Sequence, residues 1–226
     1  MEKRYERNIA ALSEQEMERL LQCRACVIGC GGLGGYIIEH LGRLGFKHIT
    51  AVDADIFEES NLNRQLLSDE SVLGQGKAAT ALLHMKKVNS KVGFTAINKK
   101  ICEDNCEDIL AGHDIVLDAL DNTATRLIVE RAAQKLAIPL IHGAVAGWYG
   151  QVCAILPGDT VLDRIYTGRE NGGLEKEFGT LPFTAAVVAS IQVCEAVKVL
   201  LNKEGTLAGR MLTLDLLENV YEIVEF

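Results

Sequence analysis

The segment RACVIGCGGLGG (residues 24–35) joins a short apolar run to a glycine-rich loop. The loop carries the spacing Gly-x-Gly-x-x-Gly at Gly29, Gly31 and Gly34. Glycines at these places allow a tight turn between a strand and a helix, and they let the amides at the helix N-terminus approach a phosphate. The segment therefore predicts the first strand–loop–helix unit of a nucleotide-binding α/β fold.

Strand and helix patterns alternate over the first 156 residues of the chain. A capping box of Ser13 and Glu16 opens a short helix before them. The expected strands are RACVIG, HITAVD, GFTAIN, DIVLDAL and IPLIHGA, and the expected helices are residues 33–44, 77–88, 103–110 and 122–136. This alternation predicts a doubly wound, Rossmann-like, mostly parallel sheet.

The pattern changes after residue 156. The segment 157–182 is polar, contains glycines and has no period, so it predicts a crossover loop. The apolar run FTAAVVASIQVC (residues 183–194) is too short for a bilayer and contains Gln192, so a buried helix is expected there. Two strands, RMLTLD and VYEIVEF, joined by a turn at residues 217–219, complete the pattern.

We therefore expect a single domain over residues 1–226. Its parts are a nucleotide-binding portion (1–156), the crossover loop (157–182) and a C-terminal helix with antiparallel strands (183–226).

The composition limits the partners of the chain. Its 226 residues hold 23 lysines and arginines against 31 acids, a net charge of −8. Non-specific binding to nucleic acid or to an anionic membrane needs a basic face, so no nucleic-acid partner and no membrane are expected. The seven cysteines are scattered through apolar segments, and the charged start MEKRYERN resembles no secretory signal. Both observations favour reduced thiols in a cytoplasmic protein.

The polar stretch VDADIFEESNLNRQ (residues 52–65) distinguishes between nucleotides. Asp53 follows Gly34 by nineteen residues and can accept hydrogen bonds from ribose hydroxyls. ATP has more phosphate charge than a dinucleotide and needs cations, usually with Mg²⁺. Arg64 and Lys77 supply cations, and Asp121 ends a later strand at the same sheet edge. Together these residues predict a triphosphate site.

Each of these three residues has a simpler interpretation when it is taken alone. Arg64 and Lys77 could be solvated surface cations, and Asp121 could be the N-cap of the helix that begins at Asn122.

Several motifs occur together in one order along the chain. They are YERNI, GCGGLG, VDAD followed by SNLNRQ, GKA, LDALDNTATR and GAVAGWYGQV. In order and spacing they resemble the HesA/MoeB/ThiF family, bacterial relatives of the ubiquitin-activating enzymes, over nearly the whole chain. The resemblance implies an adenylyltransferase that uses ATP and Mg²⁺. The C-terminal Gly-Gly carboxylate of a small ubiquitin-like or sulfur-carrier protein would attack the α-phosphate, releasing pyrophosphate and leaving an acyl-adenylate.

The resemblance also implies roles for individual residues. Asp53 would hold the ribose, Asp121 would organise Mg²⁺, and Arg7 would reach the phosphates of the neighbouring site in a homodimer. Arg64, Lys77, Asp121 and Arg7 would be the catalytic residues. The implied nucleotide-binding set is Gly29, Gly31, Gly32, Gly34, Asp53, Asp55, Asn61, Arg64, Gln65, Lys77, Asp121, Asn122 and Arg126.

The sequence departs from the family pattern at its cysteines. Many members bind a structural zinc with two CxxC pairs, but VLDRIY stands at the first expected place, so no zinc is expected. The crossover loop also lacks the reactive cysteine that some members carry there. Cys23 and Cys26 are expected to be core thiols, and Cys194 is expected to be buried. Cys102 and Cys106 are the only cysteines expected to be accessible.

A catalytic histidine is not expected, because a carboxylate nucleophile is already ionised at pH 7. His142 is the one candidate, and a structural role is expected for it. Three other functions stay open from the residues. An NAD-dependent oxidoreductase would leave Arg64, Lys77 and Asp121 unused, a relative could adenylate a tRNA or small-molecule carboxylate, and a non-catalytic partner would not need these cations.

Overall fold

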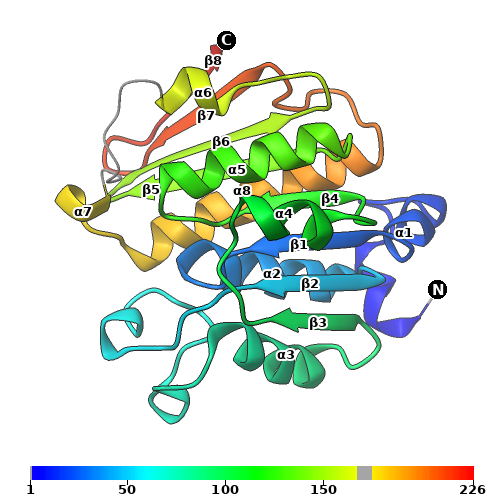
Figure 1. Cartoon of the computed structure of the whole chain (residues 1–226). Helices are drawn as coiled ribbons and strands as arrows, with labels where there is room; N and C mark the ends of the chain where they lie inside the picture. Colours follow the sequence, from blue (N-terminus) through cyan, green and yellow to red (C-terminus); the bar gives the residue numbers. More distant parts are fainter. Residues whose placement is uncertain (1, 167–174) are drawn as a thin grey trace.

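The structure is a computed structural model that describes residues 2–166 and 175–226. Within these residues, eight strands form one sheet in the order β3-β2-β1-β4-β5-β6-β7-β8 (Figure 1). This arrangement confirms the expected Rossmann-like fold with antiparallel strands at its C-terminal side.

The parallel part of the sheet sets the position of the site. It comprises β1 (Arg24–Ile28), β2 (His48–Val52), β3 (Gly93–Ile97), β4 (Ile115–Asp118) and β5 (Leu140–Ala146). Ile28 pairs with both Val52 and Asp118, and Val52 pairs with Ile97. The carboxyl ends of these strands therefore lie in one row, where ligands of open α/β sheets bind.

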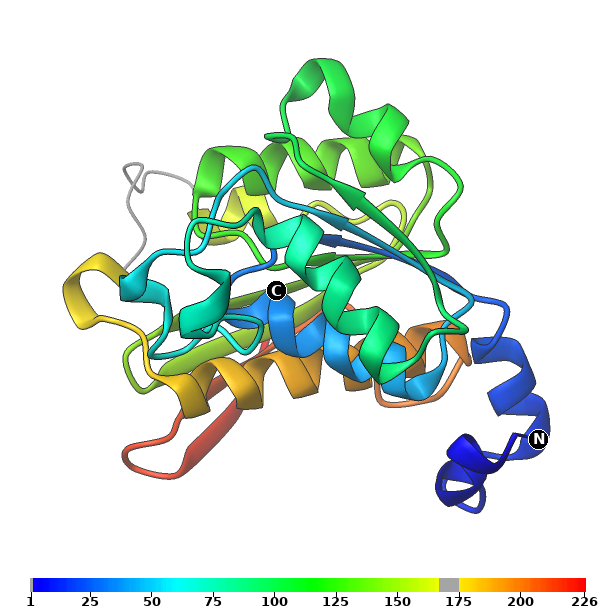
Figure 2. The same ribbon diagram turned by 90° about the horizontal axis from the view of Figure 1, so that it is seen from below.

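Helices cover both faces of the sheet, as Figures 1 and 2 show. One face carries α2 (Gly32–Leu44), α3 (Lys77–Val88) and α8 (Pro182–Leu200), and the other carries α4 (Glu103–Leu110) and α5 (Thr123–Lys135). Because the central strands are covered on both faces, their sequences are nearly continuous apolar runs. The expected capping box is present, since Ser13 and Glu16 cap α1 (Glu14–Leu20) reciprocally.

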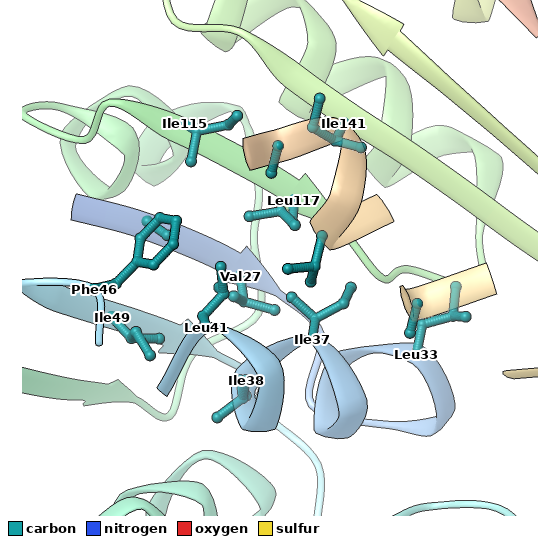
Figure 3. Close-up of a cluster of buried hydrophobic side chains, with 14 of the residues drawn as sticks. Val27, Leu33, Ile37, Ile38, Leu41, Phe46, Ile49, Ile115, Leu117 and Ile141 are labelled. Atoms are coloured by element: carbon teal, nitrogen blue, oxygen red, sulfur yellow. The ribbon is translucent and has the colours of Figure 1, made fainter. Parts of the chain in front are cut away.

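The largest apolar core lies between the sheet and α2. Figure 3 shows Val27 of β1, Leu117 of β4 and Ile37 and Leu41 of α2 directed toward one another. All four side chains are buried. The apolar face of α2 that the sequence periodicity predicts is therefore the face that packs on the sheet. Gly45 ends α2 in the left-handed conformation, with φ of +82°.

The strict alternation expected over the first 156 residues is wrong at its end. β5 connects directly to β6 (Tyr149–Ile155), and the two strands pair antiparallel. Only two residues separate them, too few for the crossover that a parallel neighbour needs. β7 (Arg210–Asp215) and β8 (Val220–Glu225) continue the antiparallel pairing, as expected.

The crossover segment also differs from the expected loop. It contains two short helices, α6 (Leu162–Tyr166) and α7 (Glu175–Phe178), while residues 167–174 lie outside the described residues. The start of α6 is held from a distance, because Oε1 of Glu130 on α5 accepts hydrogen bonds from the amides of Val161 (2.8 Å) and Leu162 (2.9 Å). A cap supplied from another helix leaves no local signal in the sequence.

The apolar run after the crossover is helix α8, longer than expected. By length and composition alone this helix could span a membrane, and half of its apolar window is buried inside the structure. It packs against β4, β5, β6 and α2, and Gln192 and Glu195 on it are buried. The expectation of a buried helix is confirmed for the face that meets the sheet.

Glu130 gives a test of how α6 is attached. Glu130→Ala removes the acceptor of two buried amides and should lower the free energy of unfolding by about 1–3 kcal/mol. Glu130→Gln keeps an oxygen acceptor of the same length and should lower it by less. Urea denaturation followed by circular dichroism measures both values, and equal losses in the two variants would contradict the role of the acceptor oxygen.

Candidate active site

A cavity of about 320 Å³ opens at the carboxyl edge of the parallel strands. The glycine loop, the ends of β1 and β2, the segments that follow β3 and β4, and the first turns of α3 and α5 line it. Eleven of the residues expected from the sequence contribute to the lining. They are Gly29, Gly31, Gly32, Asp53, Asp55, Arg64, Gln65, Lys77, Asp121, Asn122 and Arg126.

Three expected residues lie outside the lining of this cavity. Gly34 lies behind the glycine loop, in the first turn of α2. Asn61 is buried, and its Oδ1 accepts a hydrogen bond from the amide of Glu58 at 3.1 Å. Arg7 is exposed in the 3₁₀ helix η1 (Lys3–Asn8), and the N-terminus lies at the starting ends of the strands in Figure 1. Within one chain, Arg7 therefore does not reach the cavity.

Two glycines of the loop are required by close backbone approach. Gly29 has φ of +98°, and a Cβ there would lie 2.5 Å from the carbonyl oxygen of Ala119. A Cβ on Gly34 would lie 1.9 Å from the carbonyl oxygen of Gly29. The third glycine therefore lets α2 start directly beneath the loop, which aims its first amides toward the cavity.

Asp53 stands at the end of β2 with its carboxylate fixed by the backbone. Oδ2 accepts from the amide of Cys30 at 2.7 Å, and Oδ1 accepts from the amide of Asp55 at 2.8 Å. Burial raises the pKa of Asp53, although these two hydrogen bonds oppose the shift. A carboxylate has about four acceptor positions, so it can still accept from the hydroxyls of a ribose.

The predicted cations differ in how they are held. Lys77 is buried, and its Nζ lies 3.5 Å from Oδ2 of Asp55. Arg64 donates from Nη1 to the carbonyl of Ser60 at 2.9 Å and to Oδ1 of Asn63 at 2.8 Å. Both side chains are thus positioned at the cavity by neighbours and not solvated freely.

Lys99 and Lys100 also line the cavity, and the sequence reasoning missed them. They directly follow the predicted strand GFTAIN (residues 93–98), so their position after a predicted strand was the available signal. Among the described residues, the lining then has five cations against the acids Asp53, Asp55 and Asp121. A positive cavity in a chain of net charge −8 indicates a site for an anion.

Gln65 supplies a polar group without a protein partner. Its side chain lies over the glycine loop, with Nε2 3.4 Å from where a Cβ on Gly31 would stand. Its Oε1 is buried and has no hydrogen-bond partner within the described structure. Since a buried unpaired oxygen is costly, this atom is a candidate contact for a bound ligand.

Asp121 is not the N-cap of α5, so the simpler interpretation of this residue is wrong. Asn122 occupies that position, and its Oδ1 accepts from the amide of Thr125 at 2.8 Å. The exposed carboxylate of Asp121 lines the cavity and has no protein partner within the described residues. It is therefore available to a cation. The same residues hold no cluster of three or more metal-ligating side chains.

Two expectations about the cysteines are wrong. Cys106 is buried on the inner face of α4, and burial raises its pKa to about 11. Cys194 is exposed, because it lies on the face of α8 that points away from the sheet. Cys102 is exposed, and Cys23 and Cys26 are buried, as expected. None of these cysteines lines the cavity.

The fold, the glycine loop, the strand-end carboxylate and the cations define a nucleotide-binding protein of the doubly wound α/β class. The chain belongs to the ThiF family, whose family model matches residues 5–226.

Proteins similar in sequence carry the names of an activating enzyme and of an adenylyltransferase. The SAMP-activating enzyme E1 of Haloferax volcanii is 31% identical over 228 residues, covering 99% of this chain and 84% of that protein. The sulfur carrier protein adenylyltransferase of Thermus thermophilus is 33% identical over 233 residues, covering 95% and 83%. The crystal structure of E. coli MccB with ATP matches with a TM-score of 0.85 at 18% identity, covering 100% of this chain and 72% of that one, and shows a shared fold.

Gly34 allows a test of the loop geometry. Gly34→Ala places a methyl group against the carbonyl of Gly29 and should lower the free energy of unfolding by about 1–3 kcal/mol. Gly76→Ala is the matched control, since Gly76 has φ of −64° and a Cβ there would meet nothing closer than 3.8 Å. Urea denaturation measures both, and a Gly34→Ala chain as stable as the control would contradict the close approach.

Proposed function

We propose that this chain is an ATP-dependent adenylyltransferase that activates the C-terminal carboxylate of a small ubiquitin-like or sulfur-carrier protein. An acyl-adenylate forms, and pyrophosphate leaves. The observation that carries the proposal is the convergence of Arg64, Lys77 and the unpaired carboxylate of Asp121 on the cavity that holds the glycine loop.

The chemistry needs charge screening and alignment. A carboxylate is a weak nucleophile toward a polyanion, so the site must neutralise phosphate charge and hold the reacting atoms in line. The cations and the loop amides supply the neutralisation, and Asp53 fixes the nucleotide through its ribose. No side chain has to remove a proton, which agrees with the fully buried position of His142.

The residues present fit a magnesium ion held jointly by protein and nucleotide. Mg²⁺ prefers oxygen ligands and is commonly bound by one or two carboxylates together with phosphate oxygens. Asp121 offers such a carboxylate. When bound, the ion would neutralise charge on the departing pyrophosphate. We propose no zinc ion for this chain, on the absence of the paired CxxC motifs.

An oxidoreductase that uses NAD is less well supported. It would not need the cations around the cavity. The adenylyltransferases of this family use ATP, whose phosphate charge these cations would neutralise. A tRNA or small-molecule carboxylate as substrate is an alternative within the family. The acidic net charge and the sulfur-carrier relatives favour a protein carrier with a Gly-Gly terminus.

The proposed reaction ends at the acyl-adenylate, with the acceptor chemistry left to another protein. The exposed cysteines, Cys102 and Cys194, both lie outside the cavity lining. All seven cysteines are unpaired, which fits a cytoplasmic location.

We further propose a homodimer in which Arg7 serves the cavity of the partner copy. Arg7 is exposed and lies away from the cavity of its own chain. It could therefore contact the phosphates of a bound nucleotide only in the cavity of a second copy.

Substitutions in the cavity test the proposed reaction. Arg64→Ala, Lys77→Ala and Asp121→Ala should each lower the rate of carrier-dependent pyrophosphate exchange by roughly 10²–10³-fold, the scale for removing one group that stabilises transition-state charge. Lys87→Ala is the matched control, because Lys87 is exposed on α3 outside the cavity. Tight NAD binding by the wild type, without any response to ATP, would contradict the proposal.

Complementation tests Arg7. Arg7→Ala alone should lower exchange by as much as about 10³–10⁵-fold, as for arginines supplied in trans. A mixed dimer of an Arg7→Ala chain and an Asp121→Ala chain contains one intact site, so half of the wild-type rate should return. Mixing Arg7→Ala with the double variant Arg7→Ala/Asp121→Ala should restore nothing. Equal rates in the two mixtures would exclude a role in trans.

A further inference from the structure

A group of buried polar side chains lies at the wall of the cavity, and Arg126 is its one member that lines the cavity among the described residues. Asp118 and His142 are completely buried, and Arg126 is 6% exposed. Tyr166, the last residue of α6, covers them and is half-buried. These four residues come from β4, β5, α5 and α6, so they connect two neighbouring parallel strands with α5 and the crossover segment.

The four side chains form a closed ring of contacts. Nη1 of Arg126 donates to the hydroxyl of Tyr166 at 2.8 Å, and that hydroxyl lies 3.2 Å from Nε2 of His142. Nδ1 of His142 lies 2.6 Å from Oδ2 of Asp118. The same oxygen lies 3.4 Å from Nε of Arg126, an ion pair without hydrogen-bond alignment.

The chemistry of the groups fixes the direction of each bond. The Asp118 carboxylate only accepts, so Nδ1 of His142 carries a proton and donates. Burial lowers the pKa of His142 despite the neighbouring Asp118, which leaves Nε2 free to accept. Burial raises the pKa of Tyr166 to about 12, so its hydroxyl keeps the proton that it donates to Nε2. One cation and one anion remain, and their charges balance inside the protein.

The ring also holds the backbone that precedes Asp121. The amide of Leu120 donates to Oδ1 of Asp118 at 2.9 Å, and the carbonyl of Leu120 accepts from Nη2 of Arg126. Both polar groups of this residue are therefore bound by members of the ring. Asp121 follows directly, and no protein group within the described chain holds its side chain. Its orientation thus depends on the clamped residue before it.

We propose that Tyr166 and His142 are positioning residues, which hold Arg126 and Asp118 so that Leu120 presents the Asp121 carboxylate to a divalent cation bound with nucleotide. This inference rests on the proposed function, because it assigns the metal contact to Asp121. It adds the crossover segment to the site, since Tyr166 belongs to α6.

Tyr166→Phe isolates the hydroxyl. The ring of phenylalanine keeps the stacking against Arg126, whose Cζ lies 5.4 Å from the ring centroid, and the edge contact with His142. The variant removes the hydroxyl that contacts Nη1 of Arg126, Nε2 of His142 and Nε2 of Gln151. Nε2 of His142 keeps its contact with Nε2 of Gln151 at 3.3 Å. General loosening of the fold would weaken nucleotide binding equally with and without metal, whereas misplacing Asp121 weakens only the binding that the metal adds.

The measurement is therefore the ratio of ATP dissociation constants without and with Mg²⁺, determined by calorimetry. Binding of Mn²⁺ in place of Mg²⁺, followed by electron paramagnetic resonance, gives a second reading. Tyr166→Phe should reduce the ratio by about three- to tenfold, the loss of one hydrogen bond. Arg126→Lys keeps the charge but cannot bind Tyr166 and Leu120 together, so it should reduce the ratio similarly. Tyr221→Phe is the matched control, because Tyr221 is exposed on β8 outside the cavity.

The outcomes separate the two proposals. A wild type that binds no nucleotide contradicts the proposed function itself. A wild type with a metal-dependent ratio, together with Tyr166→Phe and Arg126→Lys chains that keep that ratio, overturns only the positioning role. Equal losses of affinity with and without metal would also overturn it, because they indicate a general structural effect.

Discussion

The register between neighbouring parallel strands determines which residues meet in the site. Ile28, Val52, Ile97 and Asp118 occupy equivalent rungs, so the segments that follow these strands emerge at one edge. Residues from separate parts of the chain then meet in a single cavity. A slip of one residue in any pair would turn the buried side chains of that strand to the opposite face. The apolar faces of β1 and β4 therefore specify the site as firmly as its polar residues do.

Much of the fold and of the site could be predicted because their signals are local. Glycine spacing, strand-end acids and helix periodicity each occupy a few adjacent residues, and the cavity indeed collects Asp53, Lys77 and Asp121. Several of the misses involve partners distant in sequence. The start of α6 depends on Glu130, and the fixed position of Tyr166 depends on Arg126. The exposure of Cys194 and the burial of Cys106 depend on which helix face meets the sheet, which composition alone could not decide.

The charges of the cavity lining and of the buried ion pair beside it have different effects. The chain is acidic as a whole, yet the cavity lining is mainly cationic, so the row of strand ends attracts an anion. At the wall of the cavity, the charges of Arg126 and Asp118 are buried together. A buried ion pair is a weak source of stability, but removing one partner leaves an unpaired buried charge. The pair therefore restricts which conformations this wall can adopt.

The strand order also has a consequence for how the protein is made. β1 is synthesised before every other strand, yet it occupies the interior of the sheet, where Ala25 pairs with Ile115 of β4. β2 and β3 complete one side of it early, while its other edge must wait until β4 has left the ribosome. An apolar strand with an open edge is a template for wrong pairing. The strand that leads into the glycine loop is thus exposed to wrong pairing during translation until β4 has been made.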